Sequence, residues 1–467
     1  MDLTLHLDVR DRTPLYEQIY QYIKKEIRNG NLPAMTRLPS TRELAAHLSI
    51  SRSTSQMAYD QLLSEGYIEA VPCKGYFVAG MEALVEVPLS PEIPFVEGNE
   101  ESTAYAVDFS PRGIALEGFP YGAWRKITKN VLVDDNRELF LTGDTRGEPA
   151  LREAIRGYLH SARGVSCHAD QIIVGAGNEY LLMLLMHLFP RSKSIAMENP
   201  TYKQAYRVFM SLGCQVEPVQ MDRSGMEVEA LGRSGAQIAY VMPSHQYPLG
   251  IVMPIRRRQE LLSWARAQEG RYIIEDDYDS EFRYKGKPIP ALQGMDGDQR
   301  VIYIGTFSRS IAPAIRISYL VLPPQLMERY QKNLSFYAST VSRIDQNILY
   351  QFMAGGYYER HLNRMRGIYK AKHDTLLNAL KPLEPYFETA GENAGVHILL
   401  TARNGMEEKE LVERAAGRGV HVYGLSSYDI RPREAGNTST VVLGYANLGE
   451  EEIRQGARLL TEAWCGA

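Results

Sequence analysis

Cysteine is scarce in this sequence, with four residues among 467, at positions 73, 167, 214 and 465. Their wide separation excludes the spacing of a disulfide framework and of a cysteine-based metal site. Long apolar runs are also missing: the most apolar stretch, Leu181 to Phe189, contains His187 and is far shorter than the ~18 residues of a membrane span. The N-terminus has acids where a secretory signal needs bases. We therefore expect a cytoplasmic protein with reduced cysteines and no membrane partner.

An excess of positive charge is missing too. The chain has 52 lysines and arginines against 56 aspartates and glutamates, a net charge of −4. Bulk attraction to nucleic acid is therefore excluded, and any contact with DNA must come from a local basic patch. The length allows two or three domains of roughly 100–200 residues each.

Residues 1–80 predict three helices followed by a β-hairpin, the pattern of a winged helix-turn-helix. Apolar residues recur at helical spacing, and good capping residues mark the three helix starts at Thr13-Pro14, Ser40 and Ser51. The second start is a capping box, in which the side chains of Ser40 and Glu43 each satisfy a backbone amide of the other.

The third helix is expected to lie in the major groove of DNA. Hydroxyls, an amide and one arginine at its start would reach base edges or phosphates, and two further cations would bind phosphates. The predicted DNA-binding residues are Arg42, Ser51, Arg52, Ser53, Thr54, Gln56 and Lys74. The same periodicity also fits a small helical protein-docking module whose charges are merely solvated.

Residues 81–105 form a distinct segment in which prolines alternate with glutamates. Prolines stiffen a chain and like charges extend it, so a semi-rigid linker is predicted. Its length would allow the DNA-binding domain of one subunit to lie against the large domain of another.

Residues 106–467 predict an α/β domain. Six runs rich in Ile, Val and Tyr alternate with helical patterns, as in a mostly parallel sheet with helices on both faces. They are residues 171–174, 194–197, 237–241, 272–274, 301–304 and 318–322. Ligands bind such sheets beyond the carboxyl ends of the strands.

Three segments at these strand ends could carry chemistry. The glycine turn 175–178 could hold a phosphate on its backbone amides, or be only a turn. The acidic run 275–281 could bind a divalent metal, form a solvated loop, or offer one aspartate to a protonated pyridine nitrogen. Hydroxyls and Arg316 in the segment 306–316 suit a phosphate.

Two sets of motifs resemble known families. Residues 38–45, 51–54, 65–67 and 75–78 resemble the DNA-binding domain of GntR-type repressors. The glycine turn, the acidic run and the segments 143–155, 199–202, 243–250 and 306–316 resemble a fold-type I aminotransferase domain, which ends in a small α+β part. In this order they resemble the MocR subfamily of GntR regulators.

That resemblance implies pyridoxal phosphate as cofactor and a homodimer as the functional assembly, and it implies no metal. Asp276 would pair with the pyridine nitrogen, Tyr278 would donate to the ring oxygen, and Tyr202 would stack on the ring. The other predicted cofactor-binding residues are Gly177, Asn178, Gln246, Thr306, Ser308, Arg309 and Arg316.

Two positions depart from the family pattern. Arg309 stands where the family has the lysine that forms a Schiff base, and a guanidinium stays protonated above pH ~12, so it offers no free amine. Asn447, the predicted effector-binding residue, stands where sensors of amino acids have an arginine that grips a carboxylate. Rescue by Lys203, Lys285 or Lys287, none at the motif position, is not expected.

The sequence therefore predicts a DNA-binding transcription regulator. Its aminotransferase-like domain would serve dimerisation and effector sensing, bind pyridoxal phosphate non-covalently, and lack transaminase activity. The effector would be a pyridoxal-type or amino compound. The alternatives are an active aminotransferase with an accessory DNA-binding domain, and a regulator that senses a different anionic metabolite.

Overall fold

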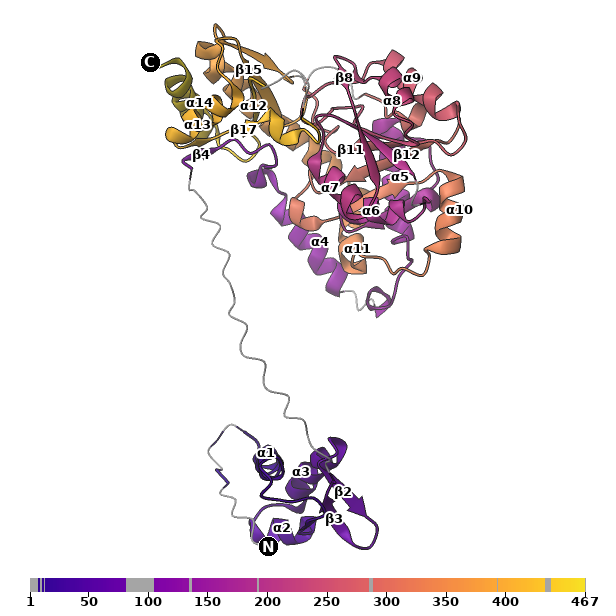
Figure 1. Ribbon diagram of the computed structural model, residues 1–467, viewed down its shortest axis with the longest axis vertical. Coiled ribbons are helices and arrows are strands. Elements are labelled where there is room, and N and C mark those ends of the chain that lie inside the picture. Colours follow the sequence, from indigo (N-terminus) through magenta and orange to yellow (C-terminus); the bar gives the residue numbers. More distant parts are fainter. Residues whose placement is uncertain are drawn as a thin grey trace. The chain divides into compact units, whose positions relative to one another are not determined.

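The computed structural model describes residues 7–8, 11, 13–80, 105–133, 137–190, 193–284, 289–392, 394–432 and 438–466. The chain divides into two compact units, Met1–Glu101 and Ser102–Ala467 (Figure 1). Apart from Tyr105, the predicted linker 81–105 lies outside the described residues, as do Lys285 and Lys287. No helix in the described part of the chain is long and apolar enough to cross a membrane.

The N-terminal unit is a winged helix-turn-helix. Its helices are α1 (Leu15–Arg28), α2 (Thr41–His47) and α3 (Arg52–Ser64). They pack against an antiparallel sheet in the order β1-β3-β2, formed by β1 (Arg37–Leu38), β2 (Ile68–Val71) and β3 (Gly75–Val78). The core between helices and sheet includes Ile19, Ile23, Tyr59, Leu62 and Val78.

Two of the three predicted helix starts are confirmed. The Ser40 side chain accepts the Glu43 amide at 3.2 Å, and the Glu43 side chain accepts the Ser40 amide at 2.8 Å, which completes the capping box. The Ser51 hydroxyl caps α3 through the Thr54 amide. The first start is wrong by one residue, because Pro14 is the N-cap and the helix begins at Leu15. The short strand β1 was not predicted.

The large unit is built on a seven-stranded sheet in the order β5-β13-β12-β11-β10-β6-β7. All six predicted strands are present, and only β13 runs antiparallel to its neighbours. The strands are β5 (Ile172–Gly175), β6 (Ser194–Glu198), β7 (Gln215–Val219), β10 (Ile238–Val241), β11 (Tyr272–Asp277), β12 (Val301–Thr306) and β13 (Ser318–Val321).

Helices cover both faces of this sheet. Alternate strand residues point to opposite sides: Tyr303 packs in the layer of α5 and α11, and Ile302 packs in the layer of α6 and α10. The helices of the unit up to this point are α4 (Tyr121–Val133), α5 (Pro149–Arg163), α6 (Asn178–Met186), α7 (Lys203–Ser211), α8 (Val228–Arg233), α9 (Ile255–Arg266), α10 (Pro324–Asn333) and α11 (Arg343–Ala354).

A smaller α+β part completes the large unit. The long helix α12 (Tyr357–Leu380) leads into a four-stranded sheet in the order β14-β15-β18-β17, packed with α13 (Glu408–Gly417) and α14 (Glu450–Cys465). Its strands are β14 (Phe387–Ala390), β15 (His397–Ala402), β17 (Tyr423–Gly424) and β18 (Thr440–Gly444).

Short strand pairs tie distant segments together. The two-residue strand β4 (Val107–Asp108), at the start of the large unit, pairs in parallel with β16 (Val420–His421) of the small part. A small antiparallel pair, β8 (Met221–Asp222) and β9 (Gly225–Met226), follows β7. The β4 pairing fixes the beginning of the segment that runs on through residues 108–113.

Candidate functional site

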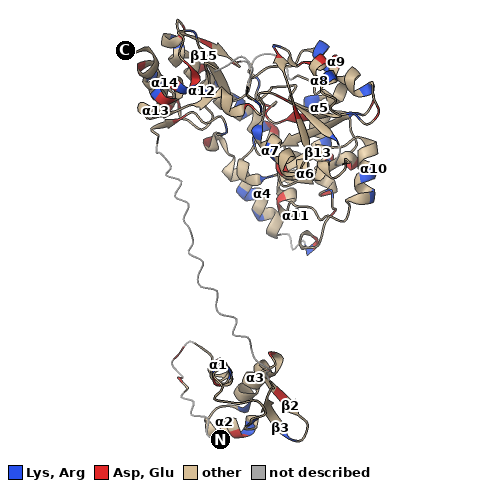
Figure 2. Cartoon of the chain, in the orientation of Figure 1, with Lys and Arg blue, Asp and Glu red and all other residues tan. Residues whose placement is uncertain are grey.

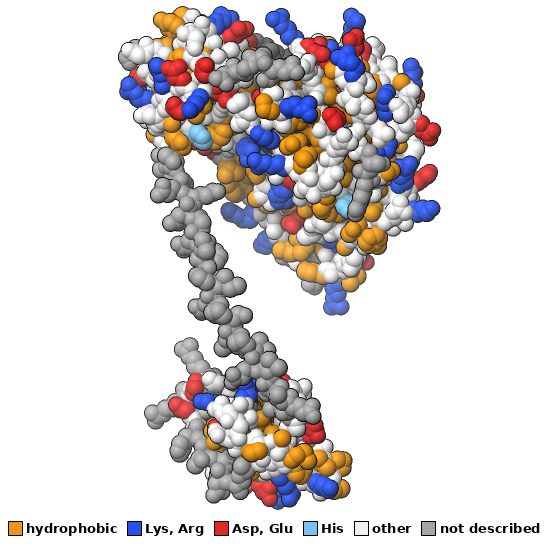
Figure 3. Space-filling view, in the orientation of Figure 1, with side chains coloured by type: hydrophobic (Ala, Val, Ile, Leu, Met, Phe, Trp, Pro, Cys, Tyr) orange, Lys and Arg blue, Asp and Glu red, His pale blue; other side chains and the backbone are white. Residues whose placement is uncertain are grey.

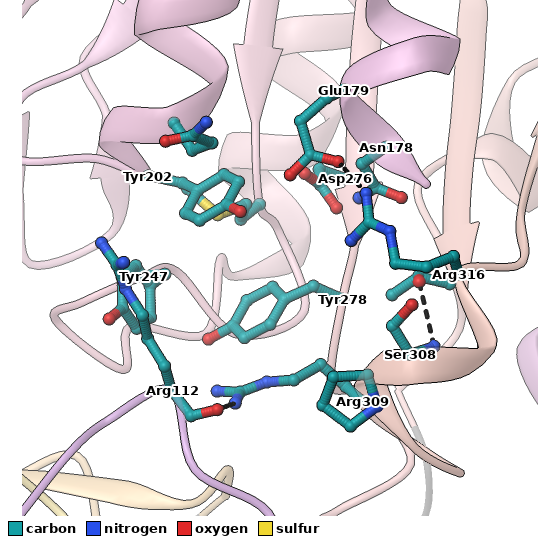
Figure 4. A pocket seen from close by; sticks show the side chains of 14 residues that line it. Arg112, Asn178, Glu179, Tyr202, Tyr247, Asp276, Tyr278, Ser308, Arg309 and Arg316 are labelled. Carbon is teal, nitrogen blue, oxygen red and sulfur yellow. Dashed lines mark hydrogen bonds and ion pairs between the residues drawn. The ribbon is translucent and has the colours of Figure 1, made fainter. Parts of the chain in front are cut away.

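A cavity of about 430 Å³ opens at the carboxyl ends of the central strands. Strand β11 contributes Asp276, and the start of α6 contributes Asn178 (Figure 4). Strand β12 contributes Thr306. The residues that line it are Arg112, Asn178, Glu179, Tyr202, Gln204, Met242, Tyr247, Asp276, Tyr278, Thr306, Ser308, Arg309, Pro313 and Arg316.

The fold thus brings together most of the residues that the sequence singled out for a cofactor. Eight of them line the cavity: Asn178, Tyr202, Asp276, Tyr278, Thr306, Ser308, Arg309 and Arg316. Gly177 borders it, since a Cβ added there would lie 2.2 Å from Nη2 of Arg316.

Gln246 and Asn447 do not line the cavity. Gln246 is buried and works within the protein, donating to the Pro200 carbonyl at 2.8 Å and accepting the Leu249 amide at 3.0 Å. Asn447 is exposed, and a Cβ added at Gly113 would lie 2.3 Å from its side-chain oxygen. It therefore packs on residue 113 instead of facing the cavity.

Asp276 is the buried acid of the cavity. One carboxyl oxygen accepts the Tyr240 hydroxyl, and the other has no hydrogen-bond partner in the part of the chain that is described. Burial raises the pKa of Asp276 to about 7; the Tyr240 hydrogen bond opposes this rise, and the nearby charge of Asp277 adds to it. A protonated ring nitrogen placed against this oxygen would stabilise the carboxylate.

The rest of the acidic run is buried and used by the fold. Asp277 pairs with Arg163 at 2.8 Å, Glu275 accepts two backbone amides, and Asp279 pairs with His245 at 2.8 Å. The expectation of a solvated loop is therefore wrong. Among the described residues, no group of three His, Cys, Asp or Glu could hold a metal ion.

The wall formed by Asn178, Ser308 and Arg316 offers polar groups for an anion, and we call it the anion-binding wall. Ser308 Oγ and Asn178 Oδ1 are buried without a hydrogen-bond partner among the described residues. Gly177 has a φ of +93°, which lets the backbone pass close to the Arg316 side chain. The Arg316 guanidinium forms an ion pair with the Glu179 carboxylate at 2.7 Å, so a side chain of the protein itself neutralises this cation.

The Arg309 guanidinium is hydrogen-bonded to the protein backbone. Its guanidinium donates to the carbonyls of Pro111 and Arg112 at 2.8 Å each, and to that of Gly113 at 3.3 Å (Figure 4). It therefore acts as a clamp on a backbone segment almost 200 positions earlier in the chain. Nothing in the sequence indicated this pairing or the place of Arg112 in the cavity lining. Tyr247 also lines the cavity and lies in the segment 243–250 that resembles the aminotransferase domain, but it was not itself predicted as a site residue.

Tyr278 is held by a buried histidine. Its hydroxyl lies 3.0 Å from Nδ1 of His245, and the Asp279 carboxylate also contacts that nitrogen. A Cβ at Gly395 would lie 2.1 Å from the histidine ring, so the ring is confined by backbone. This contact fixes the phenol on one side of the cavity.

The predicted DNA-contacting residues lie at the start of α2, at the start of α3 and on the wing. Arg42, Arg52, Ser53 and Lys74 are exposed, whereas the hydroxyl of Ser51, which is also exposed, caps α3. The Thr54 hydroxyl lies 2.8 Å from the Ser51 hydroxyl, and the Gln56 side-chain amide donates to the Asp60 carboxylate. Arg37 on β1 is a further exposed cation that the sequence reading missed; a Cβ at Gly75 of the wing would lie 3.7 Å from its Nε.

The surfaces of the two units carry charged and apolar side chains. Both signs of charge occur on the N-terminal unit, in keeping with its near balance in the sequence (Figure 2). The large unit shows apolar side chains over the region of α4 and α11 (Figure 3). Exposed large apolar side chains on α4, on the 137–141 segment and between α10 and α11 are Leu132, Phe140, Leu141, Phe336 and Tyr337, which we call the apolar surface.

The apolar surface adjoins the cavity. Arg343 at the start of α11 donates to the carbonyls of Glu138 and Leu141, which ties the helix to that surface. The Thr340 hydroxyl accepts the amide of Ala176 at 3.0 Å, in the glycine turn beside the cavity.

Comparison with known proteins assigns both units. The family described as "Bacterial regulatory proteins, gntR family" matches residues 15–78, and "Aminotransferase class I and II" matches residues 116–460.

Two relatives match over nearly the whole chain. The HTH-type transcriptional regulator YhdI of Bacillus subtilis (strain 168) is 40% identical, covering 99% of this chain and 98% of that protein. The probable rhizopine catabolism regulatory protein MocR of Rhizobium meliloti is 32% identical, covering 98% and 96%. Among solved structures, the multiple substrate aminotransferase from Thermococcus profundus superposes with a TM-score of 0.69 at 27% identity, covering 78% of this chain and 92% of that one.

Proposed function

This chain belongs to the MocR type of GntR-family transcription regulators, and from that premise we propose that its large domain binds pyridoxal phosphate or a derivative without a covalent bond. The bound compound, or an amino compound with it, would be the effector. A ligand can change transcription only by binding one DNA-binding state of the protein better than another.

We propose that the N-terminal domain binds a double-stranded DNA operator and that the protein acts in the bacterial cytoplasm. We assign the contacts to Arg42, Ser51, Arg52, Ser53, Thr54, Gln56 and Lys74, and we add Arg37. The domain boundaries that we propose are 1–80 for this domain, 81–105 for a linker and 106–467 for the effector domain. Exposed cations at a helix start and on a wing suit phosphate contacts.

The observation that carries the cofactor proposal is a set of unsatisfied polar atoms in one cavity. Asn178 Oδ1, Asp276 Oδ1 and Ser308 Oγ are all buried, and none has a hydrogen-bond partner among the described residues. Buried polar atoms without partners are rare in proteins unless a ligand or water satisfies them. Their chemistry fits the group: an acid for a ring nitrogen at one side, and a hydroxyl with an amide for a phosphate.

The remaining residues complete that fit. Tyr202 would stack on the ring, and Tyr278 would donate to the ring oxygen. Thr306 and Arg316 would join the phosphate contacts beside Gly177, once the ligand replaces Glu179 at the guanidinium. When bound, pyridoxal phosphate supplies an aldehyde and an electron-withdrawing ring. Gln246 supports the site from behind through the Pro200 carbonyl.

Covalent attachment and transaminase activity are not part of the proposal. Attachment requires an unprotonated amine, and the resemblance aligns Arg309 with the lysine that provides it. A guanidinium remains protonated at ordinary pH, and this one already donates to three carbonyls. The Lys203 amine donates to the Ser427 carbonyl at 2.9 Å and does not line the cavity.

A homodimer is the assembly that we propose. The apolar surface is too rich in exposed aromatic and leucine side chains to be ordinary solvent-facing surface, and Phe140 and Phe336 are each 74% exposed. A second copy of the chain that covers this surface would lie beside the anion-binding wall of the cavity.

Titration of the purified protein with pyridoxal phosphate tests the proposal. We expect saturable binding by calorimetry, and no pyridoxyl mass on the protein after borohydride reduction and mass spectrometry. An Arg309→Lys variant provides the matched comparison, because it restores an amine at this position. We expect this variant to gain the pyridoxyl mass on residue 309.

Each outcome of this titration is informative. A pyridoxyl adduct on the unchanged protein, together with turnover of an amino donor, would favour an active aminotransferase with an accessory DNA-binding domain. Absence of any binding would favour a regulator that senses a different anionic metabolite.

A further inference from the structure

A buried pair, Asp279 and His245, contacts Tyr278 from outside the cavity lining. Nδ1 of His245 lies 2.8 Å from one oxygen of the Asp279 carboxylate and 3.0 Å from the Tyr278 hydroxyl. His245 is 3% exposed and Asp279 is 2% exposed, and neither lines the cavity, whereas Tyr278 does. The hydrogen-bonding contact of this pair with the cavity lining is therefore made through Tyr278.

The protein backbone confines the His245 ring. A Cβ added at Gly395 would lie 2.1 Å from the ring carbon Cε1, and one added at Gly250 would lie 3.4 Å from Nε2. Gly395 is itself held in place, because its amide donates to the Phe282 carbonyl at 2.7 Å and its carbonyl accepts the Tyr445 hydroxyl at 3.0 Å. The ring is therefore held in one orientation, and its two nitrogens have different surroundings.

These surroundings determine which nitrogen of His245 carries the proton. A carboxylate can only accept hydrogen bonds, so the contact with Asp279 requires a proton on Nδ1. Nε2 is buried and has no hydrogen-bond partner among the described residues, so a proton there would lack an acceptor. Asp279 thus holds the imidazole in the tautomer that has its proton on Nδ1.

This tautomer also determines what the Tyr278 hydroxyl can do. Because Nδ1 carries its own proton, it cannot accept the tyrosine proton, which is left for Asp279 or for a ligand atom in the cavity. Burial, with the charge of Asp279 added to it, raises the pKa of Tyr278 well above its usual value, so the phenol keeps this proton. Tyr278 is therefore available as a hydrogen-bond donor toward the cavity.

We infer that Asp279 and His245 are positioning residues for ligand recognition: by keeping the imidazole proton on Nδ1, they leave the Tyr278 hydroxyl to donate to the ring oxygen of a bound phosphopyridoxyl compound. This inference rests on the proposed function, which places that ring oxygen at Tyr278. With the proton on Nε2 instead, Nδ1 would accept the tyrosine proton, and the ligand would lose its donor. A ligand without the ring oxygen should therefore be insensitive to the pair.

Calorimetry on the full chain with two compounds tests this role. Pyridoxamine phosphate carries the ring oxygen, and 3-deoxypyridoxamine phosphate lacks only that oxygen. We expect the unchanged protein to bind pyridoxamine phosphate about tenfold more tightly, because one hydrogen bond is added. Asp279→Asn should reduce this preference to about twofold or less, since an amide can donate to Nδ1 and let the proton move to Nε2. The affinity for the deoxy compound should stay nearly unchanged.

A His245→Asn variant separates the tautomer from a simple loss of contact. Asparagine places an amide nitrogen near the position of Nδ1, and this nitrogen can donate to Asp279 but cannot accept a proton. The preference for pyridoxamine phosphate should therefore survive in His245→Asn. Adding Asp279→Asn to this variant should change the preference far less than Asp279→Asn does alone. An equal effect of Asp279→Asn in both backgrounds would overturn the inference.

An Asp374→Asn variant is the matched control. Asp374 lies 3.1 Å from Nδ1 of His373, so the same substitution is made at another contact between an aspartate and a histidine, and neither residue lines the cavity. This variant should keep the full preference.

The remaining outcomes distinguish this inference from the cofactor proposal. An unchanged preference in Asp279→Asn, or an equal loss of affinity for both compounds, would overturn the role of the pair and leave the cofactor proposal standing. Equal binding of both compounds to the unchanged protein would also overturn that role alone. Failure of both compounds to bind the unchanged protein would overturn both proposals.

Discussion

Single residues set the electrostatic character of the cavity, and Asp276 sets it most directly. Its free carboxyl oxygen is buried, and burial raises the pKa of this group to about 7. An acid in this state gains most when a positively charged partner enters, because pairing removes the cost of a buried charge. The ring nitrogen of a pyridoxal compound is a partner of this kind.

We predict that Asp276→Asn weakens the binding of pyridoxamine phosphate by about tenfold. The amide is neutral, and hydrogen bonds to an ionised group are roughly twice as strong as neutral ones. Calorimetry at pH 7.5 measures this change. Asp298→Asn, at an exposed position outside the cavity, should bind like the unchanged protein. Unchanged affinity in Asp276→Asn would contradict the assignment of the ring to this side of the cavity.

Glu198, at the end of β6, gives a second residue-scale prediction. Its side chain is fully buried, and burial raises its pKa to about 8, which contacts with Gln246 and with the backbone of Met242 and Met226 offset only in part. The unfolded chain releases this proton near the ordinary glutamate pKa of 4.5, but the folded chain keeps it until about 8. Stability therefore falls as the pH rises from about 4.5 to 8.

Glu198→Gln should remove that loss, because glutamine has the same shape and never ionises. At pH 8 the variant should exceed the unchanged protein in free energy of unfolding by on the order of 2 kcal/mol, and at pH 5 the two should nearly agree. Urea denaturation at both pH values, followed by tyrosine and tryptophan fluorescence, measures the difference. A constant difference at both pH values would show that Glu198 does not titrate in this window.

At the scale of elements, we propose that the start of α3 and the wing form the surface that contacts DNA. Arg52 is the first residue of the helix; its side chain is exposed and forms no hydrogen bond or ion pair with the described residues. The Ser51 hydroxyl accepts a backbone amide as the N-cap of the helix. The arginine is therefore freer than the serine to reach a phosphate.

We predict that Arg52→Gln weakens binding to a random-sequence duplex and lowers the slope of log affinity against log salt by about one, because one phosphate contact is lost. Fluorescence anisotropy across a salt series measures both quantities. Arg28→Gln, an equally exposed change at the end of α1, is the control and should leave the slope unaltered. The same slope in Arg52→Gln and in the unchanged protein would exclude a phosphate contact by this residue.

Elements were more predictable from the sequence than their contacts. Unbroken apolar runs predicted six strands of the large sheet, because strands buried on both faces must be apolar throughout. Strand β7 was missed because it lies at the sheet edge and contains Glu217 and Pro218, which weaken the apolar pattern. The glycine turn and the acidic run were assigned to strand ends, where the fold has them.

Contacts between residues far apart in the sequence could not be predicted. Within the acidic run, the buried Asp277 is paired with Arg163, which lies 114 positions away. Arg309 meets the carbonyl of Pro111 across 198 positions, and no local pattern indicates this partner. Gln246 shares a motif with residues near the cavity, yet its side chain turns toward Pro200. Spacing can identify such residues, but only the folded chain assigns their directions.

For the whole molecule, the apolar surface on α4, the 137–141 segment and residues 334–337 predicts self-association. We expect Phe336→Asp to shift the protein from dimer to monomer at micromolar concentration, because a buried unpaired charge at an apolar interface is costly. Sedimentation velocity measures this shift. Ile255→Asp is the control: Ile255 is 59% exposed but starts α9, far from α4 in Figure 1. A monomeric unchanged protein would contradict the prediction.

The clamp made by Arg309 uses only main-chain carbonyls, and every amino acid has one. These hydrogen bonds to the backbone of residues 111–113 therefore do not depend on the side chain at position 112. An exchange of residue 112 would therefore change the lining of the cavity without removing these hydrogen bonds.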